Sequence, residues 1–402
     1  MSSEAARPRL TFIDNLRVFC IALVVLHHFS IVYGAPGDWY YVEGKPDNIL
    51  AQLPLIVFVS TNQAFFMGLL FFVSTFFVSD SYNRKGPARF VWERLIRLGI
   101  PTLAFFFLIG PFTFYLARQL TQTDGQAPSL LHVLETGAGR GFGPMWFVEI
   151  LIYFVLGYTV FRLLRARPLN HYEVPGPMPE PWKIGMFTLV LGLITWMVRI
   201  RMPVGWWAPH VQLQLAHFPQ YIAMMILGVV VWQRGWLQSL TLKQGIGWLV
   251  FANAFILVAF PILFIAGGAP SGNLDPFMGG WHWQSLGYSV YEQVVGITLM
   301  LGLLGLFQGV FNAQGRLLRA LSDSTYAVYI IHAIPVLLVS WLMRHWDFPL
   351  LAKFLVLSLP TLVVAFGMGW LIRKLPFASR VLSAVAQACP GVQHTLGDHN
   401  PA

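Results

Sequence analysis

Residues 14–28 read Asp-Asn-Leu-Arg-Val-Phe-Cys-Ile-Ala-Leu-Val-Val-Leu-His-His, an apolar run with ionisable side chains towards both of its ends. On an α-helix, each residue turns by about 100° and advances by about 1.5 Å. Arg17 and His28 then lie within about 20° of each other and about 16 Å apart along the axis, and Asp14 lies about 40° from His28 on the other side. His27 points about 100° away from this row. Because ionisable groups are costly in hydrocarbon, the row of Asp14, Arg17 and His28 indicates a functional site.

The composition is that of a membrane protein. Of the 402 residues, 56% are hydrophobic and 11% are charged, whereas about 25% are charged in a typical soluble domain. The formal net charge of +9 is spread between apolar runs, and nucleic-acid binding would need a basic patch. We therefore expect a lipid bilayer as the surroundings of this chain and no nucleic acid as its partner.

Apolar runs of about 20 residues predict membrane-spanning helices. They indicate an all-α polytopic protein in which residues 1–380 form one membrane domain and residues 381–402 a short cytoplasmic tail. We expect the third span to be broken near Pro111 and His332 to sit deep in the ninth span. The ten predicted spans are 12–33, 54–79, 98–117, 143–164, 184–200, 217–235, 244–266, 287–312, 325–343 and 350–373.

The positive-inside rule gives these spans an orientation. With the N-terminus in the cytoplasm, the inner side collects 19 of the 26 basic residues, Arg7, Arg9 and Arg167 among them. Both termini are then cytoplasmic, Arg17 lies near the inner interface, and His28 lies near the middle of a core about 30 Å thick.

Aromatic residues gather in the outer loops of this topology. Such residues most often form a belt at the membrane interface, but around a catalytic cavity they would stack on sugar rings. They are Trp39, Tyr40, Tyr41, Trp206, Trp207, Trp281 and Trp283.

Three further ionisable residues fall inside predicted spans, where such groups usually face the bundle interior or a water-filled cavity. Glu149 could orient an acceptor or His28, or make a structural hydrogen bond. Glu292 belongs to none of the motifs described below. His332 could be a helix–helix contact or a part of the catalytic site.

Five short motifs occur in an order that resembles the membrane acyltransferase-3 family. In the second motif, Thr75 stands where the family has glycine. The motifs are Asp14-Asn15-Leu16-Arg17 followed by His28, Phe71-Phe72-Val73-Ser74-Thr75-Phe76-Phe77, Arg94-Leu95-Ile96-Arg97-Leu98 with Pro101, Trp146-Phe147 with Tyr153, and Tyr326 to Tyr329 leading to His332. The segment from Tyr33 to Tyr41 is similar to a glucan-modifying, succinyltransferase-like subgroup.

The resemblance implies an inner-membrane enzyme that moves an acetyl or succinyl group from acyl-CoA to a hydroxyl of an extracytoplasmic glycan or glycoconjugate, with no metal. It implies that Arg17, Arg94 and Arg97 bind the acyl-CoA, whose phosphates suit guanidinium groups. The alternatives are that Arg17 is an interfacial anchor of its helix and that Arg94 and Arg97 reflect positive-inside topology alone. We expect Trp146, Tyr329 and His332 to contact the substrate, and Asp14 and Glu149 to belong to the catalytic set with His28. Asp14 could pair with Arg17 at i, i+3 and fix its rotamer.

The chemistry of acyl transfer favours His28 as the general base. An imidazole has an unperturbed pKa of about 6.5, so a neutral ring is available near neutral pH. A covalent acyl-histidine is the other role that this residue could have. We expect His27 to make a packing or polar contact on another face of the helix.

Two other functions fit a ten-span protein less well. Buried Glu and His residues also suit a proton-coupled transporter of a small polar solute, but such proteins carry corresponding broken helices in two halves, and the sequence has no internal repeat. A passive scaffold or receptor would leave the row of Arg17 and His28 without a purpose.

Overall fold

The computed structural model describes residues 10–46, 48–122, 127–165, 169, 174–209 and 213–382, and within these ranges the chain is helical with no β-strand. The prediction of an all-α protein is therefore confirmed. Arg7, Arg9 and Arg167 lie outside the described residues, as does the predicted tail beyond residue 382.

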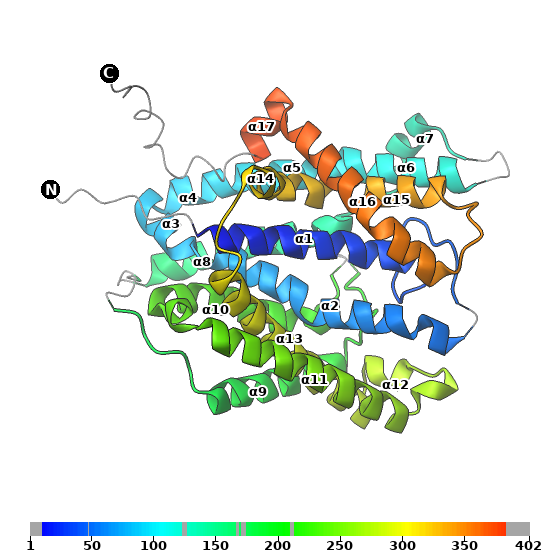
Figure 1. Cartoon of the computed structure of the whole chain (residues 1–402). Coiled ribbons are helices and arrows are strands. Elements are labelled where there is room, and N and C mark those ends of the chain that lie inside the picture. The colour runs from blue at the N-terminus through cyan, green and yellow to red at the C-terminus, as the bar shows by residue number, and fades with distance from the viewer. Residues whose placement is uncertain are drawn as a thin grey trace, which may run out of the picture.

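Seventeen α-helices account for most of the described chain (Figure 1). They are α1 (Thr11–Val32), α2 (Ile49–Thr75), α3 (Val78–Lys85), α4 (Pro87–Arg94), α5 (Ile100–Ala104), α6 (Gly110–Thr121), α7 (Leu130–Thr136), α8 (Trp146–Leu164), α9 (Pro181–Arg199), α10 (Phe218–Arg234), α11 (Leu242–Ala266), α12 (Asp275–Met278), α13 (Trp283–Gly309), α14 (Arg316–Ile331), α15 (Ala333–Leu342), α16 (Leu350–Arg373) and α17 (Pro376–Leu382).

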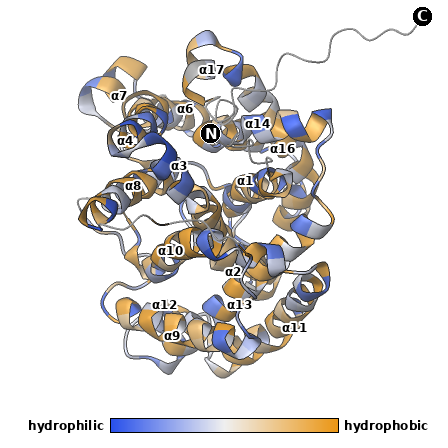
Figure 2. Ribbon diagram, turned by 90° about the vertical axis from the view of Figure 1, so that its left-hand side faces the viewer, coloured by the Kyte–Doolittle hydropathy of each residue, from blue (hydrophilic) through white to orange (hydrophobic). Residues whose placement is uncertain are grey.

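The predicted spans are confirmed as helices. Among the described residues, nine helical segments are long and apolar enough to cross a membrane, and α14 with α15 makes a tenth if this bent pair counts as one span. Figure 2 shows α9 and α11 along one edge of the bundle. Their exposed side chains include Met186, Leu189, Val258 and Ile262, as expected of helices that face lipid.

The third span differs from the prediction of a break near Pro111. Helix continues from Pro87 to Thr121, and two π-helical segments, Leu95–Gly99 and Phe105–Ile109, interrupt the α-helical pattern. Pro101 and Pro111 each lie at the start of the α-helix that follows such a segment. A proline lacks the N–H of a regular turn, and the wider π turn before it accommodates this loss without ending the helix.

Two helices organise the bundle. The largely buried α13 packs against α2, α9, α11 and α12, and α1 packs against α2, α13, α14, α15 and α16. In Figure 1, α1 runs between α2 on one side and α14 to α16 on the other. The ionisable row on α1 is therefore surrounded by helices rather than by lipid.

Small residues set the closest helix contacts. Gly245 of α11 faces Gly305 of α13, and an ideal Cβ on Gly245 would come within 2.8 Å of the Gly305 Cα. At Thr75 on α2, the glycine comes from the neighbouring helix α10, because a Cβ on Gly228 would lie 2.2 Å from the Thr75 Oγ1. The helices α2 and α10 therefore still approach each other closely, with the small residue on α10 instead of α2.

Candidate active site

His28 lies near the end of α1 within a cluster of aromatic rings. Its imidazole stacks on Trp39, with ring centroids 3.9 Å apart and planes at 15°, and on His332, with centroids 5.1 Å apart and planes at 23°. The Nδ1 atom of His28 is buried and has no hydrogen-bond partner among the described residues. A neutral imidazole nitrogen in this state can accept a proton or a hydrogen bond from a bound substrate.

Trp39 reaches His28 because the segment after α1 folds back onto the bundle. The Glu43 N–H donates to the Val32 carbonyl over 2.9 Å, and the Glu43 carboxylate pairs with the ammonium of Lys353 on α16. Gly34 has φ of +101°, and a Cβ there would lie 2.5 Å from Pro46. Of the two roles that the sequence allows for Trp39, a membrane-interface belt or the surroundings of a catalytic cavity, the contact with His28 favours the second.

His332 lies at a break in the helix rather than deep in a continuous span. The axes of α14 and α15 differ by 76° at this residue. Pro335 explains the break, because proline has no N–H to donate to the carbonyl four residues earlier, at Ile331. The His332 Nδ1 lies 2.7 Å from the Tyr329 carbonyl and must carry its proton to bond there, which leaves Nε2 as an acceptor. That Nε2 is buried and without a partner in the described chain.

A small cavity of about 70 Å³ opens beside His28. His27 also borders it, with its ring 5.5 Å from His28 and stacked on Phe66 of α2. The stacking on Phe66 is the packing contact that we expect of His27, and the structure adds that this side chain also borders the cavity. Its lining consists of Val24, His27, His28, Gln63, Phe66, Met67, Pro144, Trp146 and Tyr329.

Trp146 and Tyr329 form the wall of the cavity away from α1. Trp146 opens α8 and stacks on Tyr221 of α10 at 5.4 Å. The Tyr329 hydroxyl donates to the Pro144 carbonyl, and its ring lies 6.0 Å from the ring of His332. The structure thus brings together four of the residues that the sequence singled out, namely His28, Trp146, Tyr329 and His332.

The predicted arginines meet at the other end of α1. Arg17 pairs with Asp14 over 3.3 Å, and Arg94 and Arg97 lie close enough to Arg17 for their charges to repel one another. Arg97 lies in the first π-helical segment, and its carbonyl accepts the Tyr326 hydroxyl at 3.1 Å. Three guanidinium groups lie here near two carboxylates, Asp14 and Glu93, which leaves an excess of positive charge that a bound anion would relieve.

The two carboxylates predicted to assist catalysis lie apart from the cavity. Asp14 precedes His28 by fourteen residues, which is about 21 Å along the helix, and its partner is Arg17. Glu149 accepts the Tyr153 hydroxyl at 2.6 Å on its own helix and does not line the cavity. Direct contact of either carboxylate with His28 is therefore absent from the described structure.

A buried ionic cluster joins three residues that the sequence did not connect. Glu292 of α13 pairs with Arg199, and its Oε1 lies 3.1 Å from the His217 Nδ1. Arg199 is completely buried, and its guanidinium also donates to the Ser289 hydroxyl at 3.3 Å and to the Ala216 carbonyl at 3.2 Å. Glu292 therefore has two partners in the fold, although its neighbours in sequence suggest none.

Comparison with known protein families shows to which family the chain belongs. The model of a family described as an acyltransferase domain, the type-3 acyltransferase model, matches residues 10–370 and so covers most of the chain. No curated protein and no solved structure matches. The matched range includes every site residue described above, from Asp14 to His332.

Proposed function

Because the chain belongs to the membrane acyltransferase-3 family, we propose that this membrane acyltransferase moves an acetyl or succinyl group from acyl-CoA to a hydroxyl of an extracytoplasmic glycan or glycoconjugate. The observation that carries this proposal is the arrangement of α1. One end bears an arginine cluster suited to phosphates, and the other bears His28 beside a cavity.

The distance between these two ends fits one extended donor. Arg17 and His28 are eleven residues apart on a regular helix, which is about 16 Å along its axis. We propose that the phosphates of acyl-CoA bind Arg17, Arg94 and Arg97, and that the pantetheine arm extends along α1 and presents the thioester at the cavity. Asp14 would hold the Arg17 side chain in place through its ion pair.

The reaction then needs one proton acceptor. The oxygen of the acceptor hydroxyl forms a bond to the acyl carbon while its proton passes to the free nitrogen of His28. The carbon–sulfur bond breaks, CoA leaves as a thiolate, and His28 returns the proton to that sulfur. Trp39 stacks on the imidazole and excludes water from that face, and His332 lies beside both rings.

The placement in the cell follows from the same proposal. With the arginine cluster at the cytoplasmic face of an inner membrane, cytoplasmic acyl-CoA reaches the arginines directly and the glycan approaches from the opposite side. Positive-inside topology supports this orientation, since most basic residues fall on the arginine side.

We predict that cells lacking the protein lose one acyl modification from an envelope glycan. Mass spectrometry of glycans from cells with and without the protein should reveal a missing acetyl or succinyl increment, and that increment names the donor and the acceptor together. Identical glycan spectra from both cells would contradict a glycan acceptor.

We predict that Arg97→Gln raises the KM for acyl-CoA by roughly tenfold to a hundredfold, because one charge-assisted contact to phosphate is lost. The matched control is Arg89→Gln on α4, which removes a charge of the same kind from the surface. The Arg89 side chain is 74% exposed and pairs with Glu93. Steady-state kinetics over a range of acyl-CoA concentrations checks both variants. Equal KM shifts in the two variants would mean that Arg97 acts only as a surface charge.

The alternative of a proton-coupled transporter gains no support from the helices. Transporters of that kind place broken helices at corresponding positions of two halves. In the part of the chain that the structure describes, α14 with α15 is the one strongly bent pair. Its break presents His332 to His28 rather than to a second broken helix.

A further inference from the structure

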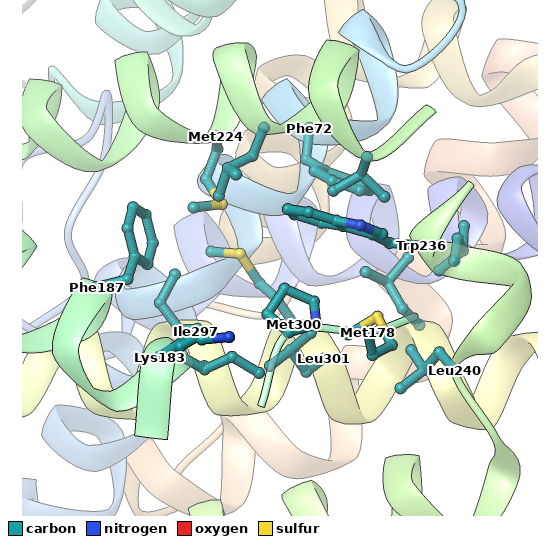
Figure 3. A pocket seen from close by; sticks show the side chains of 16 residues that line it. Phe72, Met178, Lys183, Phe187, Met224, Trp236, Leu240, Ile297, Met300 and Leu301 are labelled. Atoms are coloured by element: carbon teal, nitrogen blue, oxygen red, sulfur yellow. The ribbon is translucent and has the colours of Figure 1, made fainter. Parts of the chain in front are cut away.

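A second and larger cavity lies away from His28, between α9, α10 and α13. Its volume is about 250 Å³, and Figure 3 shows the side chains that surround it. Phe72 of α2 closes its inner end, while Met178, Met224 and Met300 contribute flexible thioether side chains that adapt to an irregular apolar ligand. Lys183 is the one charged residue among the sixteen that line it.

The cavity is a groove between two neighbouring helices, α9 and α10. Both α9 and α10 pack on other helices, α9 on α13 and α10 on α2, and they meet each other less closely. Ile184 and Phe187 line the groove from α9, Leu227 and Val231 line it from α10, and α13 forms its floor. In a bilayer, an apolar groove on the surface of the bundle is filled by a lipid chain rather than by water.

One end of the groove is basic. Lys183, in the first turn of α9, is half exposed, and its contacts are a weak 3.7 Å ion pair with Glu180 and the ring of Trp182. The segment before α9 is fixed at this end, because the Gly176 N–H donates to the Arg234 carbonyl at 2.8 Å. Arg234 is exposed there as well. Exposed ion pairs are weak, so a phosphate can compete with Glu180 for Lys183.

We propose that this groove binds an anionic phospholipid, with one acyl chain along α10 and α13 and the phosphate on Lys183. The apolar lining selects a hydrocarbon chain, and the basic end selects a negatively charged headgroup. The site is separate from the acyl-transfer cavity, since the two linings share no residue. The lipid in this groove therefore takes no part in acyl transfer.

Native mass spectrometry of the delipidated full-length protein, titrated with phosphatidylglycerol or phosphatidylcholine, tests the site. We expect phosphatidylglycerol to bind about fivefold more tightly than phosphatidylcholine. One basic residue gives an attraction of this size for a negatively charged headgroup. In Lys183→Gln this preference should vanish, because the side chain no longer carries the charge that distinguishes the two headgroups. The matched control Lys243→Gln, at an exposed lysine outside the groove, should keep the preference.

Filling the groove tests the chain site separately. Leu227→Trp from one wall and Ile184→Trp from the other should each lower the affinity for both lipids by about tenfold or more. Ile226→Trp is the matched control, because Ile226 is 55% exposed on the outer face of the same helix. Equal lipid affinities in the wild type, or loss of binding in the controls to the same degree, would overturn the proposal.

Discussion

Replacement of His28 by glutamine is expected to lower the turnover number for acyl transfer by about 10²–10⁴-fold, the usual contribution of a general base. Glutamine fills a similar space against Trp39 and His332 but offers no basic nitrogen. Acyl-CoA binding should be nearly unchanged, because the arginine cluster lies about 16 Å away along α1. Transfer of a radiolabelled acyl group to the acceptor measures the rate, and isothermal titration with CoA measures the binding.

The neighbouring histidine provides the control for this prediction. His27 borders the same cavity and stacks on Phe66, so His27→Gln is a matched change in the same surroundings. We expect a loss of less than about tenfold from that variant. If both variants lost activity equally, the base assignment to His28 would fail, and a general role in shaping the cavity would explain the loss.

Incubation with labelled acyl-CoA in the absence of acceptor separates the two roles of His28. A general base leaves the protein unlabelled, whereas a nucleophile accumulates one acyl group per protein in a burst. Labelling that disappears in His28→Gln would identify an acyl-histidine. The same experiment with His332→Gln tests whether His332 carries the acyl group. Its Nε2 is the second imidazole nitrogen without a partner, and its ring stacks on His28.

Local periodicity was enough to predict the fold class and one face of the site. Arg17 and His28 lie on one helix, so their separation and phase follow from helical geometry alone. The spacing of Arg94 and Arg97 likewise placed them on one face, and the structure adds that this face meets Arg17. The spans were predictable because each one is a continuous apolar run.

The partners of His28 could not be predicted from periodicity, because they come from loops and breaks. Trp39 reaches the imidazole because an ion pair holds its segment against the bundle. This pair joins Glu43 to Lys353, which lies 310 residues further along the chain. Nothing near Trp39 in the sequence distinguishes it from a residue of an interface belt. The break at His332 did carry a signal, since Pro335 removes the hydrogen bond at Ile331.

The buried cluster around Glu292 was missed for the same reason. Its ion pair joins residues 93 positions apart, and its contact with His217 joins residues 75 positions apart. A span prediction assigns each of these residues to a different helix or loop and gives no distance between them. The cost of an unpaired charge in such a place indicates that a partner exists, but only the tertiary packing identifies it.

Replacement of Glu292 by leucine is expected to destabilise the protein by about 3–5 kcal/mol, because it leaves the completely buried Arg199 without its counter-charge. Thermal denaturation in detergent, followed by size-exclusion chromatography, should show a lower Tm and less folded protein. The matched control is Glu180→Gln, since Glu180 is 62% exposed and its ion pair with Lys183 spans 3.7 Å. An exposed pair of this kind contributes at most about 1 kcal/mol.

A paired variant separates the unpaired charge from a simple packing defect. Arg199→Met combined with Glu292→Leu removes both charges and keeps side chains of similar length, and replacement of a whole buried ion pair is often neutral. The double variant should therefore recover more than half of the stability that Glu292→Leu loses. The Ser289 hydroxyl and the Ala216 carbonyl lose the Arg199 donor in the double variant, so the recovery should stay incomplete. A double variant no more stable than Glu292→Leu would show that packing, and not the isolated guanidinium, sets the cost.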